Sequence, residues 1–337
     1  MSPPRATWWR QATPGTTYWR CTVPAKQLPG RVNGLIASDL VCENGEYRIP
    51  AQIGQASIWQ YVGNATRGVL MALLSEQGFR VLMEVDDNYL ALAPGMRDWQ
   101  ADFARGGASA DGDKPSLAAN RRIAEWADGV ICSTERLCEV YSEVNEHVYH
   151  CPNSVNPDDW AEPKPKDGPL KIIWSASGSH HIDAPLVRRA LEWAVKQANV
   201  EVYLVGYTAP SWRGRFQRLG WTNSMEEHRQ RLAAINPDIG ICALYPGHWA
   251  DCKSDVKALE YGMVGAVSVC SDVEAYRPMK GKPALFCKTG KDFERTIQWC
   301  VRHSDEVREM GRKAREYVLA ERQIKHWISR WEEAIEG

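Results

Sequence analysis

The chain has 337 residues, of which 44% are hydrophobic and 25% charged. This composition excludes a disordered tail, a collagen-like repeat and a small secreted scaffold, and at roughly 100–200 residues per domain the length predicts two domains. No stretch approaches the roughly 18 apolar residues of a membrane span, and the N-terminus shows no secretory signal. The ten cysteines are scattered without a CxxC pair. They predict reduced thiols in a cytoplasmic protein and not a disulfide framework.

The distribution of charge differs between the two halves, although the net charge is only −1. Residues 1–160 carry 14 Lys and Arg against 19 Asp and Glu, and the remainder carries 27 against 23. We therefore expect an anionic small ligand to bind in the second half.

The first 38 residues combine cations and aromatic side chains without any acid. The set is Arg5, Arg10, Arg20, Lys26 and Arg31 with Trp8, Trp9, Tyr18 and Trp19. One interpretation is a segment that neutralises a DNA backbone and stacks on bases. The other is that the aromatic side chains form the core of the first strand while the cations are solvated.

Short apolar runs alternate with amphipathic stretches along the first half. They predict strands at 56–62, 80–85, 129–132 and 147–151, and helices at 66–77, 117–127 and 134–144. Gly78 ends the first of these helices, and Ser133 is a candidate cap for the last. Strands that alternate with helices imply parallel βαβ units.

A proline-rich segment at 161–169 is the best candidate for a linker, because it has three prolines, a glycine and no apolar periodicity. The alternation then restarts. It predicts strands at 170–174, 200–205, 239–244 and 266–270, helices at 184–197, 225–235 and 254–263, and a helical tail at 304–335 that is broken near Glu321. The predicted organisation is a domain at 1–160, the linker, a domain at 170–303 and a tail at 304–337.

Several common nucleotide and hydrolase signatures are missing from the sequence. No Gly-x-Gly-x-x-Gly follows a predicted strand, and neither Gly-x-x-x-x-Gly-Lys-Ser/Thr nor Gly-x-Ser-x-Gly occurs. These absences argue against a dinucleotide oxidoreductase, a P-loop ATPase and an ordinary esterase.

The stretch 238–272 is the richest in candidate chemistry. Lys253 and Lys257 are four residues apart and are predicted to share a face near the start of a helix, where the helix dipole favours a diphosphate. Glu260 follows on that face, where its carboxylate can accept from both hydroxyls of a ribose. The alternative is a solvated helix with a lysine pair and a surface glutamate.

Four stretches of the sequence resemble GT-B glycosyltransferases, closest to the family 4-like enzymes of bacteria and phages. They are VLMEVDDNYL (81–90), CPNSVNPDDW (151–160), IIWSASGSHHID (172–183) and the 238–272 segment with its KSD-x-K-x-LEYG core. The resemblance implies an α/β fold of two Rossmann-like parallel-sheet domains that face a central cleft, with C-terminal helices packing back toward the first domain. The first domain would bind the acceptor and the second a nucleotide-sugar donor.

The resemblance also implies roles for individual residues of the donor domain. Lys253 and Ser254 match positions that grip the donor diphosphate, and Glu260 matches the second glutamate of a Glu-x7-Glu motif that holds the ribose. Cys252 stands where the first glutamate is expected, so the motif is broken, and Asp251 is a candidate substitute.

A small-residue loop and two aromatic positions complete the implied donor site. Ser177, Gly178, Ser179 and His180 match a loop whose backbone amides approach the phosphates and the sugar, and we interpret Asp183 only as a helix cap. Gly206-Tyr207 and Trp221-Thr222 lie at the ends of strands where a base could stack; the alternative for Trp221 is a core position.

Asp86 and Asp87 follow a strand of the first domain and are candidates for a general base, or for a pair that orients the acceptor hydroxyl. The alternative is a turn or a helix cap. Adjacent residues at a strand end point to opposite sides, so we expect only one of the two to face the substrate.

No metal site is predicted. Asp111 and Asp113 form an Asp-x-Asp, but in a loop rich in Gly, Ser and Ala that we interpret as solvated. The group Cys132, Cys138, His147, His150 and Cys151 fails as a zinc site, because His147 and His150 point to opposite faces of a strand.

The function implied is transfer of a sugar from a UDP- or GDP-linked donor to a hydroxyl acceptor, without cofactor or metal and with retention of configuration. The expected acceptor is a macromolecule: a hydroxymethylated base of phage DNA, a virion protein or an envelope glycan. Two alternatives stay open, namely a module that only binds nucleotide sugars and a GT-B epimerase.

Overall fold

The computed structural model describes residues 5–10, 14–28, 32–36, 41–43, 46–48, 53–60, 65–91, 117–207 and 211–337. The chain divides into two compact units, and the first consists of Met1–Asn153, Cys252–Ser254 and Ile324–Gly337. The second consists of Ser154–Asp251 and Asp255–Gln323. Residues 252–254 and the last helix therefore group with the first unit, although they follow the predicted linker in the sequence.

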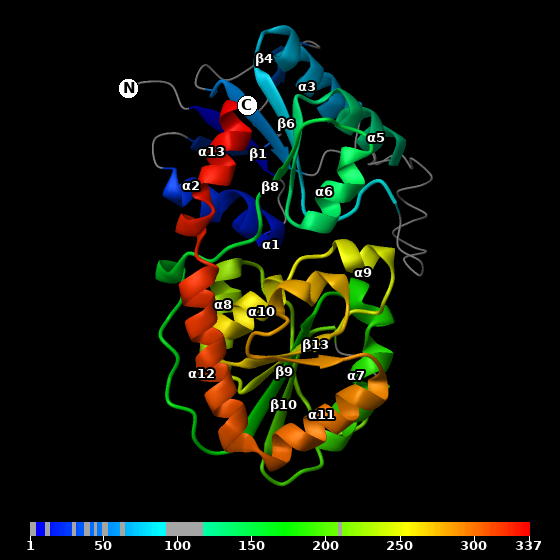
Figure 1. The fold of residues 1–337 in the computed structure, drawn as a ribbon, viewed down its shortest axis with the longest axis vertical. Helices are drawn as coiled ribbons and strands as arrows, with labels where there is room; N and C mark the ends of the chain where they lie inside the picture. Colours follow the sequence, from blue (N-terminus) through cyan, green and yellow to red (C-terminus); the bar gives the residue numbers. More distant parts are fainter. Residues whose placement is uncertain are drawn as a thin grey trace. The chain divides into compact units, whose positions relative to one another are not determined.

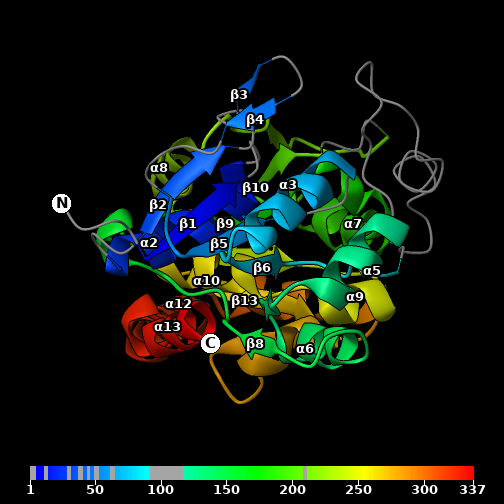
Figure 2. The ribbon, with the colours of Figure 1, turned by 90° about the horizontal axis from the view of Figure 1, so that it is seen from above.

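A six-stranded parallel sheet forms the centre of the first unit, with strands in the order β2-β1-β5-β6-β7-β8. The strands are β1 (Ala6–Arg10), β2 (Val32–Ile36), β5 (Ala56–Gln60), β6 (Arg80–Val85), β7 (Gly129–Cys132) and β8 (Val148–His150). A separate antiparallel ribbon of β3 (Val41–Glu43) and β4 (Glu46–Arg48) stands apart from this sheet (Figure 2). The four strands predicted in the first half are confirmed as β5 to β8.

Helices cover the first sheet on both faces. They are α1 (Pro14–Thr17), the π-helix η1 (Tyr18–Thr22), α2 (Val23–Gln27), α3 (Ala65–Glu76), α5 (Leu117–Trp126), α6 (Glu135–Ser142), η6 (Ile324–His326) and α13 (Ile328–Glu336). Helix α13 lies beside α2 and β8 (Figure 1), and its Trp331 packs against Trp8 of β1 with ring centroids 5.4 Å apart. The predicted return of the C-terminal helix to the first domain is thus confirmed.

The cap of α6 differs from the prediction by one residue. The side chain of Thr134, not of Ser133, accepts a hydrogen bond from the amide of Leu137. Thr134 has the extended backbone conformation that an N-cap requires, and Ser133 instead donates to the carbonyl of Asp86.

The aromatic side chains of the N-terminal segment are buried in the first unit. Trp8, Trp9, Tyr18 and Trp19 are each no more than 5% exposed. Arg20 is buried too, and its guanidinium pairs with the Glu84 carboxylate at 2.5 Å and donates to the Cys151 carbonyl. Burial removes these rings from base stacking and Arg20 from a phosphate backbone. The aromatic part of the core interpretation is therefore favoured, whereas its expectation of a solvated cation is wrong for Arg20.

A second six-stranded parallel sheet forms the centre of the second unit, with strands in the order β11-β10-β9-β12-β13-β14. The strands are β9 (Leu170–Ala176), β10 (Val200–Gly206), β11 (Gln217–Leu219), β12 (Ile239–Cys242), β13 (Val267–Ser271) and β14 (Ala284–Cys287). The two parallel α/β sheets expected from the sequence are therefore confirmed.

Helices lie on both faces of the second sheet. They are η3 (Pro157–Asp159), η4 (Gly178–Ile182), α7 (Ala184–Ala194), α8 (Met225–Ile235), α9 (His248–Cys252), α10 (Val256–Met263), η5 (Glu274–Met279), α11 (Gly290–Arg302) and α12 (Ser304–Glu321). Helices α7 and α11 pack together on one face, and α10 and α12 pack together on the other (Figure 1). The predicted break of the tail near Glu321 is confirmed, because α12 ends there.

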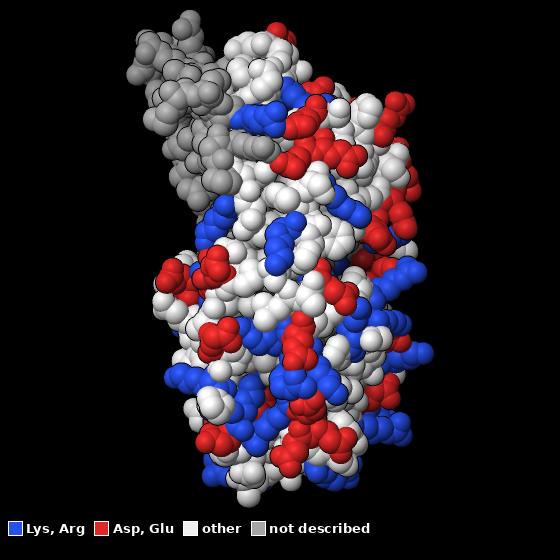
Figure 3. All heavy atoms as spheres, turned by 60° about the vertical axis from the view of Figure 1, so that its left-hand side comes forward, with Lys and Arg blue, Asp and Glu red and all other residues white. Residues whose placement is uncertain are grey.

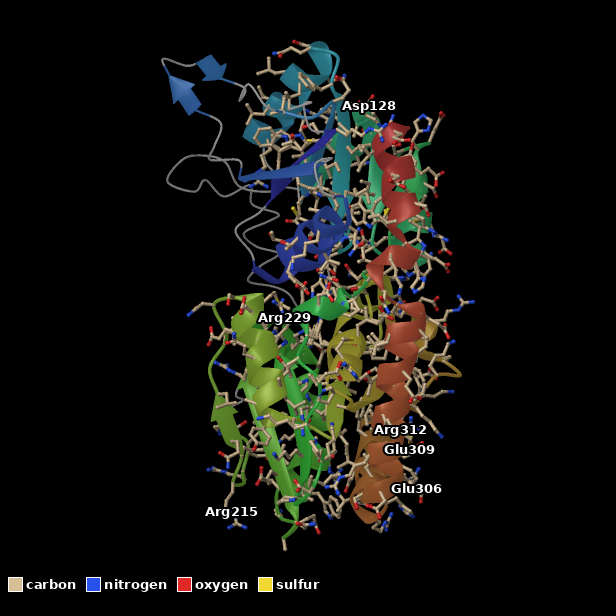
Figure 4. All side chains as sticks on the ribbon, turned by 90° about the vertical axis from the view of Figure 1, so that its left-hand side faces the viewer. Asp128, Arg215, Arg229, Glu306, Glu309 and Arg312 are labelled. Atoms are coloured by element: carbon tan, nitrogen blue, oxygen red, sulfur yellow. The ribbon has the colours of Figure 1, made fainter. Side chains whose placement is uncertain are left out.

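The outer face of α12 carries alternating charges. Figure 3 shows Lys and Arg interspersed with Asp and Glu over this part of the second unit. Glu309 and Arg312 lie side by side on the helix (Figure 4), with their charged groups 2.6 Å apart. Both side chains are exposed, and surface pairs of this kind contribute little to stability. Among the described residues, no helix is both long and apolar enough to cross a membrane.

Candidate functional site

The strand order of the second sheet reverses between two neighbours, β9 and β12. From β9 the chain adds β10 and β11 on one side, and from β12 it adds β13 and β14 on the other. In open α/β sheets, ligands bind outside the carboxyl ends of the strands at this reversal. The segments that leave β9 and β12 there are η4 and the loop 243–247.

The loop after β9 contains the four small or polar residues that the sequence singled out. Ser177 precedes the 3-10 turn η4 that starts at Gly178, and the space next to Gly178 is open, since an added Cβ would meet no atom within 4 Å. The amide of His180 donates to the Ser177 carbonyl within the turn. The His180 amide is therefore not directed at a ligand. Only the backbone of the residues before His180 in this loop can approach one. The Ser179 side chain lies outside the described residues.

Asp183 does not cap α7 with its side chain, and the prediction that it acts only as a cap is wrong. Its carboxylate instead accepts from two groups: Oδ2 lies 2.6 Å from Nδ1 of His180, and Oδ1 accepts from the amide of Tyr245 at 2.5 Å. The carboxylate accepts from these two donors, one of them 62 residues away, and therefore makes no capping hydrogen bond to α7.

His180 also contacts the first turn of α10. The ammonium of Lys257 lies 3.0 Å from Nε2 of His180, and the imidazole is only 13% exposed. Asp183, His180 and Lys257 thus form a continuous chain of polar contacts beside the strand reversal.

Helix α10 begins later than predicted, and this changes the lysine pair. Its N-cap is Asp255 and its first residue is Val256, so Lys253 lies outside the helix and does not share a face with Lys257. The Asp255 carboxylate does not cap the helix but pairs with buried Arg322, at 2.5 and 2.9 Å. The shared-face prediction for Lys253 is therefore wrong, whereas Lys257 and Glu260 are three apart in α10 and do lie on neighbouring positions.

Glu260 is buried, and a residue that the sequence analysis missed holds it. Nε2 of His228, on α8, lies 3.2 Å from the Glu260 carboxylate, and each side chain is at most 10% exposed. No local pattern links two residues 32 positions apart. The sequence shows only a histidine in the amphipathic helix α8, which alone does not predict a partner.

Trp221 is exposed, so the alternative of a core tryptophan is wrong. Its side chain is 56% accessible and lies over Gly206 at the end of β10, where an added Cβ would come within 2.4 Å of the indole. Gly206 has φ +83°, a conformation that glycine adopts without strain. Trp221 follows β11, an edge strand, and not one of the middle strands as predicted.

Lys253 and Ser254 lie in the first unit. The Lys253 ammonium donates to both carboxylate oxygens of Asp87, at 2.9 and 3.1 Å, and Ser254 accepts from the Asn153 amide at 2.8 Å. Cys252, which occupies the position of the missing glutamate, is buried among apolar side chains of that unit. Lys253 therefore pairs with Asp87, which the sequence analysis interpreted as a candidate residue for the acceptor hydroxyl.

Asp86 and Asp87 follow β6 in a bend, because the strand ends at Val85. The argument that adjacent strand residues point to opposite sides does not apply to them. They nevertheless have different partners: Asp86 accepts from the hydroxyl of Tyr89 at 2.7 Å, and Asp87 pairs with Lys253. Burial raises the pKa of Asp87 to about 6, although the Lys253 charge opposes that shift.

No group of three or more metal-ligating side chains occurs among the described residues. His150 contacts Arg330 of α13, at 3.1 Å. Asp111 and Asp113, the Asp-x-Asp of the sequence, lie outside the described residues.

Comparison with known proteins relates part of the chain to a sequence family and its fold to solved structures. Residues 187–333 match the sequence model of a glycosyl transferase-like family. No curated protein matches the chain significantly in sequence. The structure of HepE from Anabaena with UDP and glucose is similar over 98% of both chains, with a TM-score of 0.69 and 11% identity.

Two further structures are similar over most of this chain. TarM matches over 84% of this chain and 55% of its own, with a TM-score of 0.58 and 13% identity. Sucrose-phosphate synthase from Thermosynechococcus elongatus matches over 83% and 72%, with a TM-score of 0.55 and 15% identity. This chain thus spans about half the length of the TarM chain. The strand topology and the similarity to these structures confirm the expected fold class, the two parallel α/β sheets of a GT-B fold.

Proposed function

We propose that this protein is a glycosyltransferase that binds a nucleoside-diphosphate sugar beside the carboxyl ends of β9 and β12 and transfers the sugar to a hydroxyl acceptor. The observation that carries the proposal is the convergence of His180, Lys257 and the start of α10 at the strand reversal of the second sheet. The HepE structure that contains UDP-glucose supports UDP as the nucleotide.

The diphosphate is assigned to Lys257, to the start of α10 and to the loop Ser177–Ser179. As the glycosidic bond breaks, the departing nucleoside diphosphate gains negative charge. A fixed ammonium and a helix N-terminus stabilise that charge without reorganising. The Asp255 side chain does not cap α10, because it pairs with Arg322, and the N-terminus of this helix is suited to an anion.

The nucleoside is assigned to Glu260 and Trp221. One oxygen of the Glu260 carboxylate contacts His228, and the other can accept from the ribose hydroxyls. The exposed indole of Trp221 offers a flat surface on which a base can stack.

The acceptor is assigned to Asp86 and Asp87 of the first unit, with Lys253 paired to Asp87. In this assignment Asp87 orients the acceptor hydroxyl or takes its proton. The sequence resemblance supports a metal-independent reaction that retains configuration.

The decisive experiment incubates the full chain with UDP- and GDP-linked sugars, with and without acceptor. Release of nucleoside diphosphate together with sugar on the acceptor supports the transferase. An epimerised donor identifies an epimerase, and binding without turnover identifies a binding module. Either of these two results overturns the proposed function.

The acceptor is tested with mass-tagged sugar against hydroxymethylated DNA, virion protein and lipid-linked glycan in parallel. The proposal expects one of these macromolecules to be labelled. Glu260→Gln then serves as a site control: the nucleoside contact predicts weaker binding of UDP but unchanged binding of pyrophosphate, and exposed Glu306→Gln on α12 should change neither.

A further inference from the structure

We propose that Asp183 is a positioning residue, which fixes the tautomer of His180 and joins the loop after β9 to the loop after β12. The inference rests on the proposed donor site, because its consequence is the presentation of His180 and Lys257 to the nucleotide sugar. Asp183 itself does not touch the ligand in this assignment.

The geometry around Asp183 is that of a buried bridge. The carboxylate is 4% exposed, and its two oxygens accept from different loops: Oδ2 from Nδ1 of His180 at 2.6 Å, and Oδ1 from the amide of Tyr245 at 2.5 Å. The two loops leave β9 and β12, the strands between which the sheet order reverses. The Asp183 side chain therefore links the two loops beside which such sheets bind ligands.

The contacts of His180 select one protonation form. Nδ1 faces a carboxylate and therefore carries a proton, while Nε2 lies 3.0 Å from the Lys257 ammonium and must supply a lone pair. The neutral Nδ1–H tautomer satisfies both contacts. The Nε2–H tautomer and the imidazolium each place two N–H groups against one another at Lys257. Asp183 thus allows His180 to hold the Lys257 ammonium in place.

The Asp183 carboxylate fixes the backbone at Tyr245 in addition to orienting His180. Tyr245 is 57% exposed, yet its amide is fixed by Asp183. The backbone of the loop after β12 is therefore held at the reversal point while its side chain remains accessible. Removal of Asp183 is expected to free both this loop and the imidazole.

Asp183→Asn separates the two roles. The Tyr245 amide still requires an acceptor, so the Asn oxygen faces Tyr245 and its NH2 group faces Nδ1 of His180. Nδ1 then becomes the acceptor, the proton moves to Nε2, and the contact with Lys257 is lost. Asp183→Ala instead loses both contacts. The two variants therefore differ in whether the Tyr245 amide keeps its acceptor, and both lose the contact between His180 and Lys257.

The tautomer can be observed directly by nitrogen NMR of the full chain labelled on its eight histidines, with His180 assigned through His180→Gln. The expected wild-type signal is the neutral Nδ1–H form, and Asp183→Asn should show Nε2–H. Amide exchange at Tyr245 should stay slow in Asp183→Asn and become fast in Asp183→Ala. The affinity for UDP should fall about tenfold in both variants, on the order of one hydrogen bond to a charged group.

The matched control is Asp238→Asn. Asp238 is also buried and also accepts a backbone amide, that of Lys171, but at the opposite end of β12. It should lower stability without changing the His180 tautomer or UDP binding.

Three results would overturn the inference: a wild-type His180 that is protonated at Nε2, an unchanged tautomer in Asp183→Asn, or UDP binding unaffected in both Asp183 variants. The wild-type spectrum alone decides the tautomer, even where a variant fails to fold. Failure of the proposed function looks different: the wild-type protein then binds no nucleoside diphosphate, whatever the state of His180.

Discussion

Replacement of Lys257 by Met tests the charge at the proposed diphosphate site. The substitution keeps the length of a half-buried side chain and removes its ammonium, which lies 3.0 Å from His180 in the first turn of α10. At an effective dielectric constant near 20, an ammonium about 4 Å from a phosphate charge contributes about 4 kcal/mol. Loss of one preorganised donor to a developing charge costs about 3 kcal/mol, or roughly a 150-fold decrease in kcat/KM.

The effect on binding of the intact UDP-sugar should be smaller, about tenfold, because its diphosphate acquires full charge only as the glycosidic bond breaks. UDP itself already carries that charge, so its affinity should fall at least as much. Calorimetry with each ligand and steady-state transfer kinetics measure these effects. Lys291→Met on the exposed face of α11 is the matched control and should change none of these quantities. Unaltered UDP affinity together with kcat/KM within threefold of wild type would refute the assignment of Lys257 to the diphosphate.

The remaining predictions concern the acceptor residue and the base. Transfer should accelerate as the pH rises through about 6, because burial raises the pKa of Asp87 to about 6 and only its ionised form accepts a proton. Asp87→Asn should abolish this rise and Lys253→Met, which removes the opposing cation, should move it to higher pH; a wild-type profile that is flat from pH 5 to 8 contradicts the role. Trp221→Ala should weaken UDP binding by about 1–3 kcal/mol and spare pyrophosphate, whereas equal losses for the two ligands would exclude base stacking. Gly206→Ala should destabilise the fold by about 2–4 kcal/mol in urea titrations, since its φ is +83° and the new Cβ would lie 2.4 Å from the Ala176 carbonyl and from Trp221; an unchanged midpoint would show that the indole moves away freely.

The central parallel strands were predictable because both of their faces are covered. Strands such as β7 and β12 then appear in the sequence as short uninterrupted apolar runs. Helix α11 and strand β14 were missed, although Thr289 and Asp292 form a capping box at the start of α11 that a search for this signature would have found. Strand β1 was predicted without bounds, as the first strand of the core interpretation of the N-terminal segment.

The start of α10 was predicted too early for a physical reason. Ser254 and Asp255 are both good N-cap residues, and local preference alone does not choose between them. The buried ion pair of Asp255 with Arg322, 67 residues further along the chain, fixes Asp255 at the end of α12 and sets the start of the helix. Lys253 was consequently placed on a helix that does not include it.

In the candidate site, too, individual residues were predictable from the nearby sequence, whereas contacts between residues far apart in the sequence were not. Lys257 and Glu260 were found from their spacing on a predicted helix, and His180 from the family resemblance. The contacts of Asp183 with Tyr245 and of Glu260 with His228 were not predicted, because their members are 62 and 32 residues apart. A buried carboxylate with two donors, such as Asp183, orders other groups, while the half-buried Lys257 ammonium lies in the first turn of α10, where the diphosphate is proposed to bind. Variants of Asp183 should therefore alter the tautomer of His180 and the loop after β12, and variants of Lys257 should alter donor binding and turnover directly.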